Sequence, residues 1–134
     1  MLDLPFNHTV TIILITCIVS FIAFSKETVM NRLIFWPPAL QRGQYDRFIT
    51  HGFIHADGAH LLFNMITLFF FGSVIESFYR QYLYDLGFIL FYLGGLIAAI
   101  LPSYLKHKND ARWASLGASG AVSAVLFAYI LFEP

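Results

Sequence analysis

The chain has little charge of either sign. Only 12% of its 134 residues are Asp, Glu, Lys or Arg, and eight acidic side chains balance eight basic ones. A balance of this kind provides neither the basic field that attracts nucleic acid nor an acidic tail. We therefore expect no nucleic-acid partner.

Cysteine is almost absent as well. The single cysteine, Cys17, lies inside an apolar run, which excludes an intrachain disulfide and a metal cluster held by thiolates. His51 and His55 form an i, i+4 pair, but Asp57 is the only further ligand nearby, which is too few for a zinc site. We expect no metal and interpret both histidines as packing or capping groups.

Hydrophobic residues, in contrast, make up 58% of the chain, and the mean hydropathy is +0.69. These values are typical of membrane proteins. Roughly 20 apolar residues cross the hydrocarbon layer as a helix, and four stretches approach or reach this length: residues 9–25, 60–78, 83–105 and 116–134. The sequence predicts an all-α, polytopic helical membrane bundle.

The first apolar run could be mistaken for a signal peptide. The residues before it carry Asp3 and no Lys or Arg, and no small-residue cleavage motif follows it, so we expect it to be retained. We also expect a single domain over residues 1–134, because the chain has no internal repeat, low-complexity tract or linker.

Residues 26–59 form a connection too long for a tight turn between helices. Its aromatic residues and arginines suit a segment lying in the headgroup region of the bilayer. The alternative is a loop that merely covers helix ends. Pro37 and Pro38 exclude one continuous helix through this stretch.

The distribution of basic residues also bears on how the chain is oriented across the membrane. The first and third connections together hold almost all the basic residues: Lys26, Arg32, Arg42, Arg47, Lys106, Lys108 and Arg112. The other side holds Arg80. The positive-inside rule would place those two connections in the cytoplasm.

Two polar residues in the second apolar run are candidates for chemistry. His60 and Asn64 are spaced i, i+4 and share one helix face. Both side chains can donate hydrogen bonds, as is required to hold a developing oxyanion. The alternative is that they hydrogen-bond to a neighbouring helix and stabilise packing in the membrane.

Ser119 is the candidate nucleophile. Gly117 and Gly120 flank it in a Gly-x-Ser-Gly sequence, which leaves the hydroxyl accessible. If a helix begins near Leu116, its unpaired first-turn amides point toward this region and can donate to a negative oxygen. The alternative is close helix packing, because small residues recur at spacings of three and four: Gly117, Gly120, Ala121 and Ala124.

The joint pattern resembles the rhomboid family of intramembrane serine proteases. It consists of His55-Ala-Asp-Gly-Ala-His60-Leu-Leu-Phe-Asn64, then Gly72 and Glu76, and then Gly117-Ala118-Ser119-Gly120. Residues 45–51, Tyr-Asp-Arg-Phe-Ile-Thr-His, are similar to the aromatic-Arg stretch of that family, with Asp46 in place of the usual Trp. The resemblance covers about residues 45–132.

The resemblance implies a nucleophile at Ser119 and an oxyanion hole made by His60, Asn64 and the backbone N–H of Ser119. It implies transmembrane protein substrates cleaved within the lipid bilayer, no cofactor, and a cytoplasmic N-terminus in a membrane such as the bacterial cytoplasmic membrane. This orientation contradicts the charge count. The family has six spans, so four are present here and two C-terminal spans of the same protein are missing.

The base histidine of the family lies on the sixth span. A serine hydroxyl is a weak nucleophile without an adjacent base, and His107 has no evident group to orient it, so we expect the 134 residues alone to be inactive. Two further alternatives remain open. One is a rhomboid-like pseudoprotease that binds membrane helices without cutting them, and the other is a structural helix-packing subunit.

Overall fold

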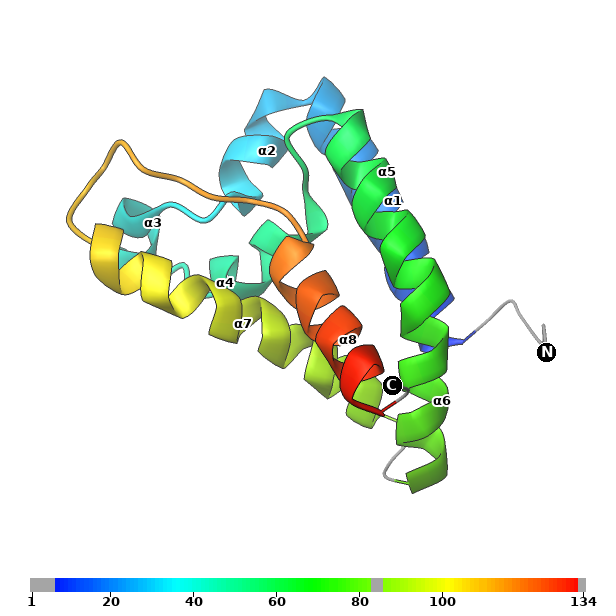
Figure 1. Cartoon of the computed structure of the whole chain (residues 1–134). Helices are drawn as coiled ribbons and strands as arrows, with labels where there is room; N and C mark the ends of the chain where they lie inside the picture. The colour runs from blue at the N-terminus through cyan, green and yellow to red at the C-terminus, as the bar shows by residue number, and fades with distance from the viewer. Residues whose placement is uncertain (1–6, 83–85, 133–134) are drawn as a thin grey trace.

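The computed structural model describes residues 7–82 and 86–132, and every regular element in these ranges is helical (Figure 1). Three helical segments are long and apolar enough to cross a membrane: His8–Ser25, Gly58–Tyr82 and Gly87–His107. The helix Ser119–Phe132 is apolar but has 14 residues, or about 21 Å at the usual rise. The predicted all-α membrane bundle is confirmed.

Helix α1, His8–Ser25, stands where the sequence predicted a span over residues 9–25. Asn7 precedes it as the N-cap, and its side chain accepts a hydrogen bond from the N–H of Val10. The helix buries one stripe at spacings of three and four residues: Thr9, Ile12, Thr16, Ser20 and Ala23. The remaining apolar side chains of α1 are largely exposed, as suits a lipid-facing surface.

The second apolar run forms one longer rod than the predicted residues 60–78. It consists of α5 (Gly58–Thr67), a π-helical turn η2 (Leu68–Gly72) and α6 (Ser73–Tyr82). Asp57 caps its start by accepting from the N–H of His60. The buried Glu76 carboxylate accepts from the N–H and the hydroxyl of Thr9, both at 2.8 Å, which ties α6 to the beginning of α1.

Helices α7 (Gly87–His107) and α8 (Ser119–Phe132) pack side by side (Figure 1). Their contact is close because Gly95 meets the backbone of Ala121, and Gly120 leaves room for Ala99. This is the small-residue packing that the sequence indicated. Of the predicted spans 83–105 and 116–134, residues 83–85 and 133–134 lie outside the described residues.

The predicted start of the last helix near Leu116 is wrong. Helix α8 begins at Ser119. Ser115 pairs with Phe35 in an isolated β-bridge, and Gly117 has a φ of +112°, which an α-helix cannot accommodate. Residues 115–118 are therefore a non-helical lead into the helix.

The long connection is folded into short helical elements. It contains α2 (Glu27–Leu33), α3 (Pro37–Gln41), α4 (Arg47–Thr50) and the 3₁₀ turn η1 (His51–Phe53). Pro37 starts α3, where its missing N–H costs nothing. The buried Arg47 guanidinium donates to the carbonyls of Asn31 and Ile34 at 3.0 and 2.7 Å, which closes this segment on itself.

Candidate active site

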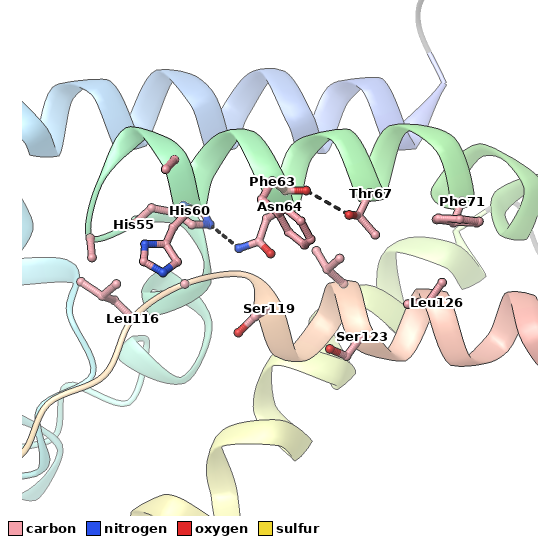
Figure 2. A pocket seen from close by; sticks show the side chains of 14 residues that line it. His55, His60, Phe63, Asn64, Thr67, Phe71, Leu116, Ser119, Ser123 and Leu126 are labelled. Carbon is pink, nitrogen blue, oxygen red and sulfur yellow. Dashed lines mark hydrogen bonds between the residues drawn. The ribbon is translucent and has the colours of Figure 1, made fainter.

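A pocket of about 980 Å³ lies between α5 and α8. The residues singled out in the sequence meet on its walls, with His60 and Asn64 on the α5 side and Ser119 at the start of α8 (Figure 2). Phe63, Thr67 and Ser123 line it as well. Tertiary packing has therefore brought together polar groups that are more than fifty residues apart in the chain.

Ser119 is the first residue of α8. Its hydroxyl has no hydrogen-bond partner among the described residues, and the same holds for its backbone N–H. At a helix N-terminus such an amide belongs to the positive end of the helix dipole. The position combines an accessible hydroxyl with a donor suited to an anionic oxygen.

The lead into Ser119 is held by the long connection. Phe35 and Ser115 exchange two backbone hydrogen bonds of 2.9 and 3.0 Å, and the N–H of Gly117 donates to the carbonyl of His51 at 2.8 Å. The N–H of Ala118 donates to Nε2 of His55 at 3.3 Å. The residues before Ser119 therefore take their position from a segment more than sixty residues earlier.

His60 is oriented by Asp57. The Asp57 carboxylate accepts from the backbone N–H of His60 at 2.8 Å and from its Nδ1 at 2.9 Å. The backbone hydrogen bond from His60 is the main cause that lowers the pKa of Asp57, which keeps it an acceptor. Since Nδ1 then carries a hydrogen, Nε2 can donate toward the pocket only when the imidazole carries both protons.

Asn64 is oriented by His55. Its Nδ2 lies 3.0 Å from Nε2 of His55, the hydrogen bond drawn in Figure 2. The partners of His60 and Asn64 are thus Asp57 and His55, both in the connection that precedes α5. The alternative in which these two side chains bond to a neighbouring membrane helix does not match these contacts.

The roles of Asp57 and His55 were missed from the sequence. For Asp57 a signal existed, because an aspartate three residues before a histidine at a helix start is a typical N-cap. His55 was interpreted as a packing or capping group, and no periodicity links it to Asn64 across the intervening turn. Its side chain is 1% exposed.

His51 is also buried, and its Nδ1 lies 2.9 Å from the carbonyl oxygen of Arg47. It lines a second cavity of about 190 Å³ on the α7 side of Ser119, together with Ser103 and Ser115. A polar space of this size can hold water.

Comparison with known proteins bears directly on this site. A family model described as the Rhomboid domain matches residues 42–134, which include His60, Asn64 and Ser119. The chain belongs to the rhomboid family. The expected resemblance is confirmed at the level of the family, and the protein is an integral membrane protein.

Curated relatives of this rhomboid chain come from a plant and from bacteria. It is 32% identical over 127 residues to RHOMBOID-like protein 12, mitochondrial, of Arabidopsis thaliana, an alignment that covers 83% of this chain and 36% of that protein. It is 32% identical over 120 residues to the rhomboid protease GlpG of Salmonella typhi, covering 86% and 40%. The chain therefore spans well under half the length of these relatives.

Proposed function

We propose that this rhomboid is the nucleophile-bearing part of an intramembrane serine endopeptidase that cleaves transmembrane helices of other proteins. The observation that carries the proposal is the arrangement at Ser119. An unpartnered hydroxyl and an unpartnered helix N-terminal amide share one pocket with the side chains of His60 and Asn64.

In this proposal, Oγ of Ser119 attacks the scissile carbonyl carbon and the carbonyl oxygen becomes an oxyanion. The backbone N–H of Ser119 and the amide of Asn64 donate to that oxygen, and Nε2 of His60 donates to it when the imidazole carries both protons, because Nδ1 already donates to Asp57. A general base takes the proton of the Ser119 hydroxyl and gives it to the leaving amine as the C–N bond breaks, and an acyl-enzyme remains. Water then releases the acyl group, and the polar cavity behind Ser119 offers it a place.

We propose that the general base comes from outside the 134 residues, since none of the described histidines, His51 included, hydrogen-bonds the Ser119 hydroxyl. His55 has both ring nitrogens in hydrogen bonds, His60 bonds Asp57, and His107 stacks on Trp113 at 4.6 Å between ring centroids. The relatives are more than twice as long as this chain. We propose that two further spans of the same protein supply the histidine of a Ser-His dyad.

The walls of the pocket suit an apolar substrate. Phe63, Phe71, Val122 and Leu126 line it beside the polar groups. A membrane helix that unwinds locally could present its side chains to these residues and its backbone carbonyl to Ser119. We propose access from the non-cytoplasmic side with a cytoplasmic N-terminus, as in a bacterial cytoplasmic membrane, although the distribution of basic residues favours the opposite orientation.

The first test is labelling by a fluorophosphonate in the complete protein. We expect the probe to label wild type, and Ser119→Ala to abolish both labelling and cleavage of a transmembrane substrate. Ser123→Ala is the matched control, since Ser123 lies one turn further along α8 in the same pocket. Labelling that survives in Ser119→Ala, or that disappears in Ser123→Ala, would contradict the assignment of the nucleophile.

The second test concerns the oxyanion donors. His60→Ala and Asn64→Ala should each lower kcat by roughly 10²- to 10³-fold with little change in KM, as removal of one oxyanion donor does. Thr67→Ala serves as control, because the Thr67 hydroxyl lines the same pocket but bonds its own helix at Phe63. Rates of the two donor variants equal to that of Thr67→Ala would rule out the role.

A rhomboid-like pseudoprotease is the second candidate. The observation in its favour is that none of the histidines in the described residues hydrogen-bonds the Ser119 hydroxyl. A complete, folded protein that binds membrane helices but resists the fluorophosphonate would support this candidate over the protease.

A further inference from the structure

One buried histidine is not itself a proposed oxyanion donor but contacts two of the segments that carry such donors. His55 is 1% exposed and lies in the connection between η1 and α5. Its Nδ1 faces the Ser20 hydroxyl of α1 at 3.2 Å, and its Nε2 faces both Nδ2 of Asn64 and the N–H of Ala118. Three segments distant in the sequence converge on this ring.

The direction of these hydrogen bonds follows from proton counting. Ser20 has one hydroxyl hydrogen, and it donates this hydrogen to the carbonyl of Phe53 at 2.9 Å. Its oxygen can therefore only accept from His55, so Nδ1 carries the ring hydrogen and Nε2 presents a lone pair. The backbone N–H of Ala118 can only donate, so it too requires a lone pair on Nε2, which it shares with Asn64 in a three-centre hydrogen bond.

The tautomer of His55 in turn sets the orientation of the Asn64 amide. A lone pair on Nε2 accepts from the Asn64 NH₂ group and repels its carbonyl oxygen, so the amide cannot flip without losing the contact at 3.0 Å. One N–H of Asn64 is used by His55, and the second remains for the pocket. The amide of Ala118 is likewise used, so the Ser119 amide is the first unpartnered donor of α8.

We propose that His55 is a positioning residue that aims two oxyanion donors, the second Asn64 N–H and the Ser119 backbone N–H, through a chain of hydrogen bonds anchored at Ser20. The inference rests on the proposed function for its catalytic consequence. The tautomer of His55 is a property of the fold and does not depend on that function.

Burial supports this role. Desolvation is the main cause that lowers the pKa of His55 to about 4, with smaller effects of His60, which lowers it, and Asp57, which raises it. The ring is therefore neutral at pH 7 and keeps the lone pair on Nε2. A charged ring would present a hydrogen to two donors and break both contacts.

The catalytic test changes Ser20 or His55 and leaves the oxyanion donors themselves in place. In the complete protein, Ser20→Ala and His55→Leu should lower kcat for a transmembrane substrate by roughly 10- to 100-fold, the usual effect of losing a group that orients a reacting residue, with KM nearly unchanged. His55→Gln, which keeps an acceptor oxygen, should recover part of the loss. Thr16→Val is the matched control, because the Thr16 hydroxyl is buried on the same face of α1 and has no partner among the described residues.

Non-additivity separates positioning from general stability. If His55 acts partly through Asn64, His55→Leu should slow the Asn64→Ala variant by a clearly smaller factor than it slows wild type. Fully multiplicative effects, or equal kcat in Ser20→Ala and Thr16→Val, would overturn the proposal.

A measurement that does not depend on catalysis distinguishes the role of His55 from the proposed function. Nitrogen-15 NMR of the folded wild-type protein at pH 7 should show His55 neutral with its hydrogen on Nδ1, and Ser20→Ala should change the Nδ1 chemical shift, because that hydrogen loses its acceptor. The signal is assigned by its loss in His55→Gln. A hydrogen on Nε2 in wild type would refute the role of His55, whereas a protein with the expected tautomer but no cleavage would refute only the proposed function.

Discussion

Gly117 illustrates how one residue serves the site. Its φ of +112° lies in the region that only glycine adopts without strain, and a Cβ there would meet nothing closer than His55 at 4.0 Å. The residue is thus required for backbone conformation and not for space. It turns the chain from the bridge at Ser115 into the first turn of α8.

We expect Gly117→Ala to cost about 1–3 kcal/mol of stability through backbone strain and to slow fluorophosphonate labelling of Ser119. Thermal unfolding in detergent and the labelling rate measure the two effects. Gly43→Ala is the control, since Gly43 has a φ of +94°, has open space around it and does not line the pocket. It should lose similar stability and keep normal labelling. Equal labelling rates in both variants would show that the turn does not set the position of Ser119.

At the scale of elements, the contact between α7 and α8 determines where the nucleophile stands. A Cβ on Gly120 would overlap with that of Ala99, and a Cβ on Gly95 would lie 3.2 Å from the Cα of Ala121. Backbone atoms thus approach across this interface without intervening side chains. Because Ser119 precedes Gly120 directly, any separation of the helices moves it.

Gly120→Ala should destabilise the protein by about 1–3 kcal/mol through overpacking and lower the rate of substrate cleavage. Ala99→Gly in the same protein should restore much of both, because the added methyl group then has room. Gly94→Ala is the control within α7, since nothing lies within 4 Å of its added Cβ. The interpretation is wrong if the double variant is no more stable than Gly120→Ala alone, as measured by thermal unfolding.

At the scale of the whole molecule, unfolding is coupled to proton uptake by His55. Its pKa is about 4 in the fold, against an ordinary value of 6.5. Above pH 6.5 the ring is neutral in both states and its contribution is complete. As the pH falls from 6.5 to 4 only the unfolded chain gains the proton, so stability decreases by up to about 3 kcal/mol.

The measurement is the thermal midpoint of wild type and of His55→Gln between pH 7 and pH 4. We expect the midpoint of wild type to fall more steeply, and the difference between the two proteins isolates His55. This comparison is needed because burial lowers the pKa of His51 too, which acts in the same direction. Parallel curves would show that His55 takes up no proton on unfolding.

Local sequence features sufficed for much of the architecture. Long apolar runs determine membrane helices because unpaired backbone groups are too costly in lipid, and α1, the rod from α5 to α6, and α7 follow them closely. The spacing of His60 and Asn64 places both on one face of α5 because the helical period requires it. The sequence also showed the small residues of α8 that allow it to approach α7.

Only the tertiary structure decided which groups orient the site. His55 and Ala118 are separated by 63 residues, and Phe35 and Ser115, which pair in a β-bridge, also lie far apart in the sequence. Periodicity reports neighbours within one element and carries no information about partners between elements. The sequence by itself therefore determined the membrane helices and the candidate residues Ser119, His60 and Asn64. The start of α8 and the hydrogen bonds of His55 depend on how the folded connection packs against the helices, because directional bonds form only after distant segments are brought together.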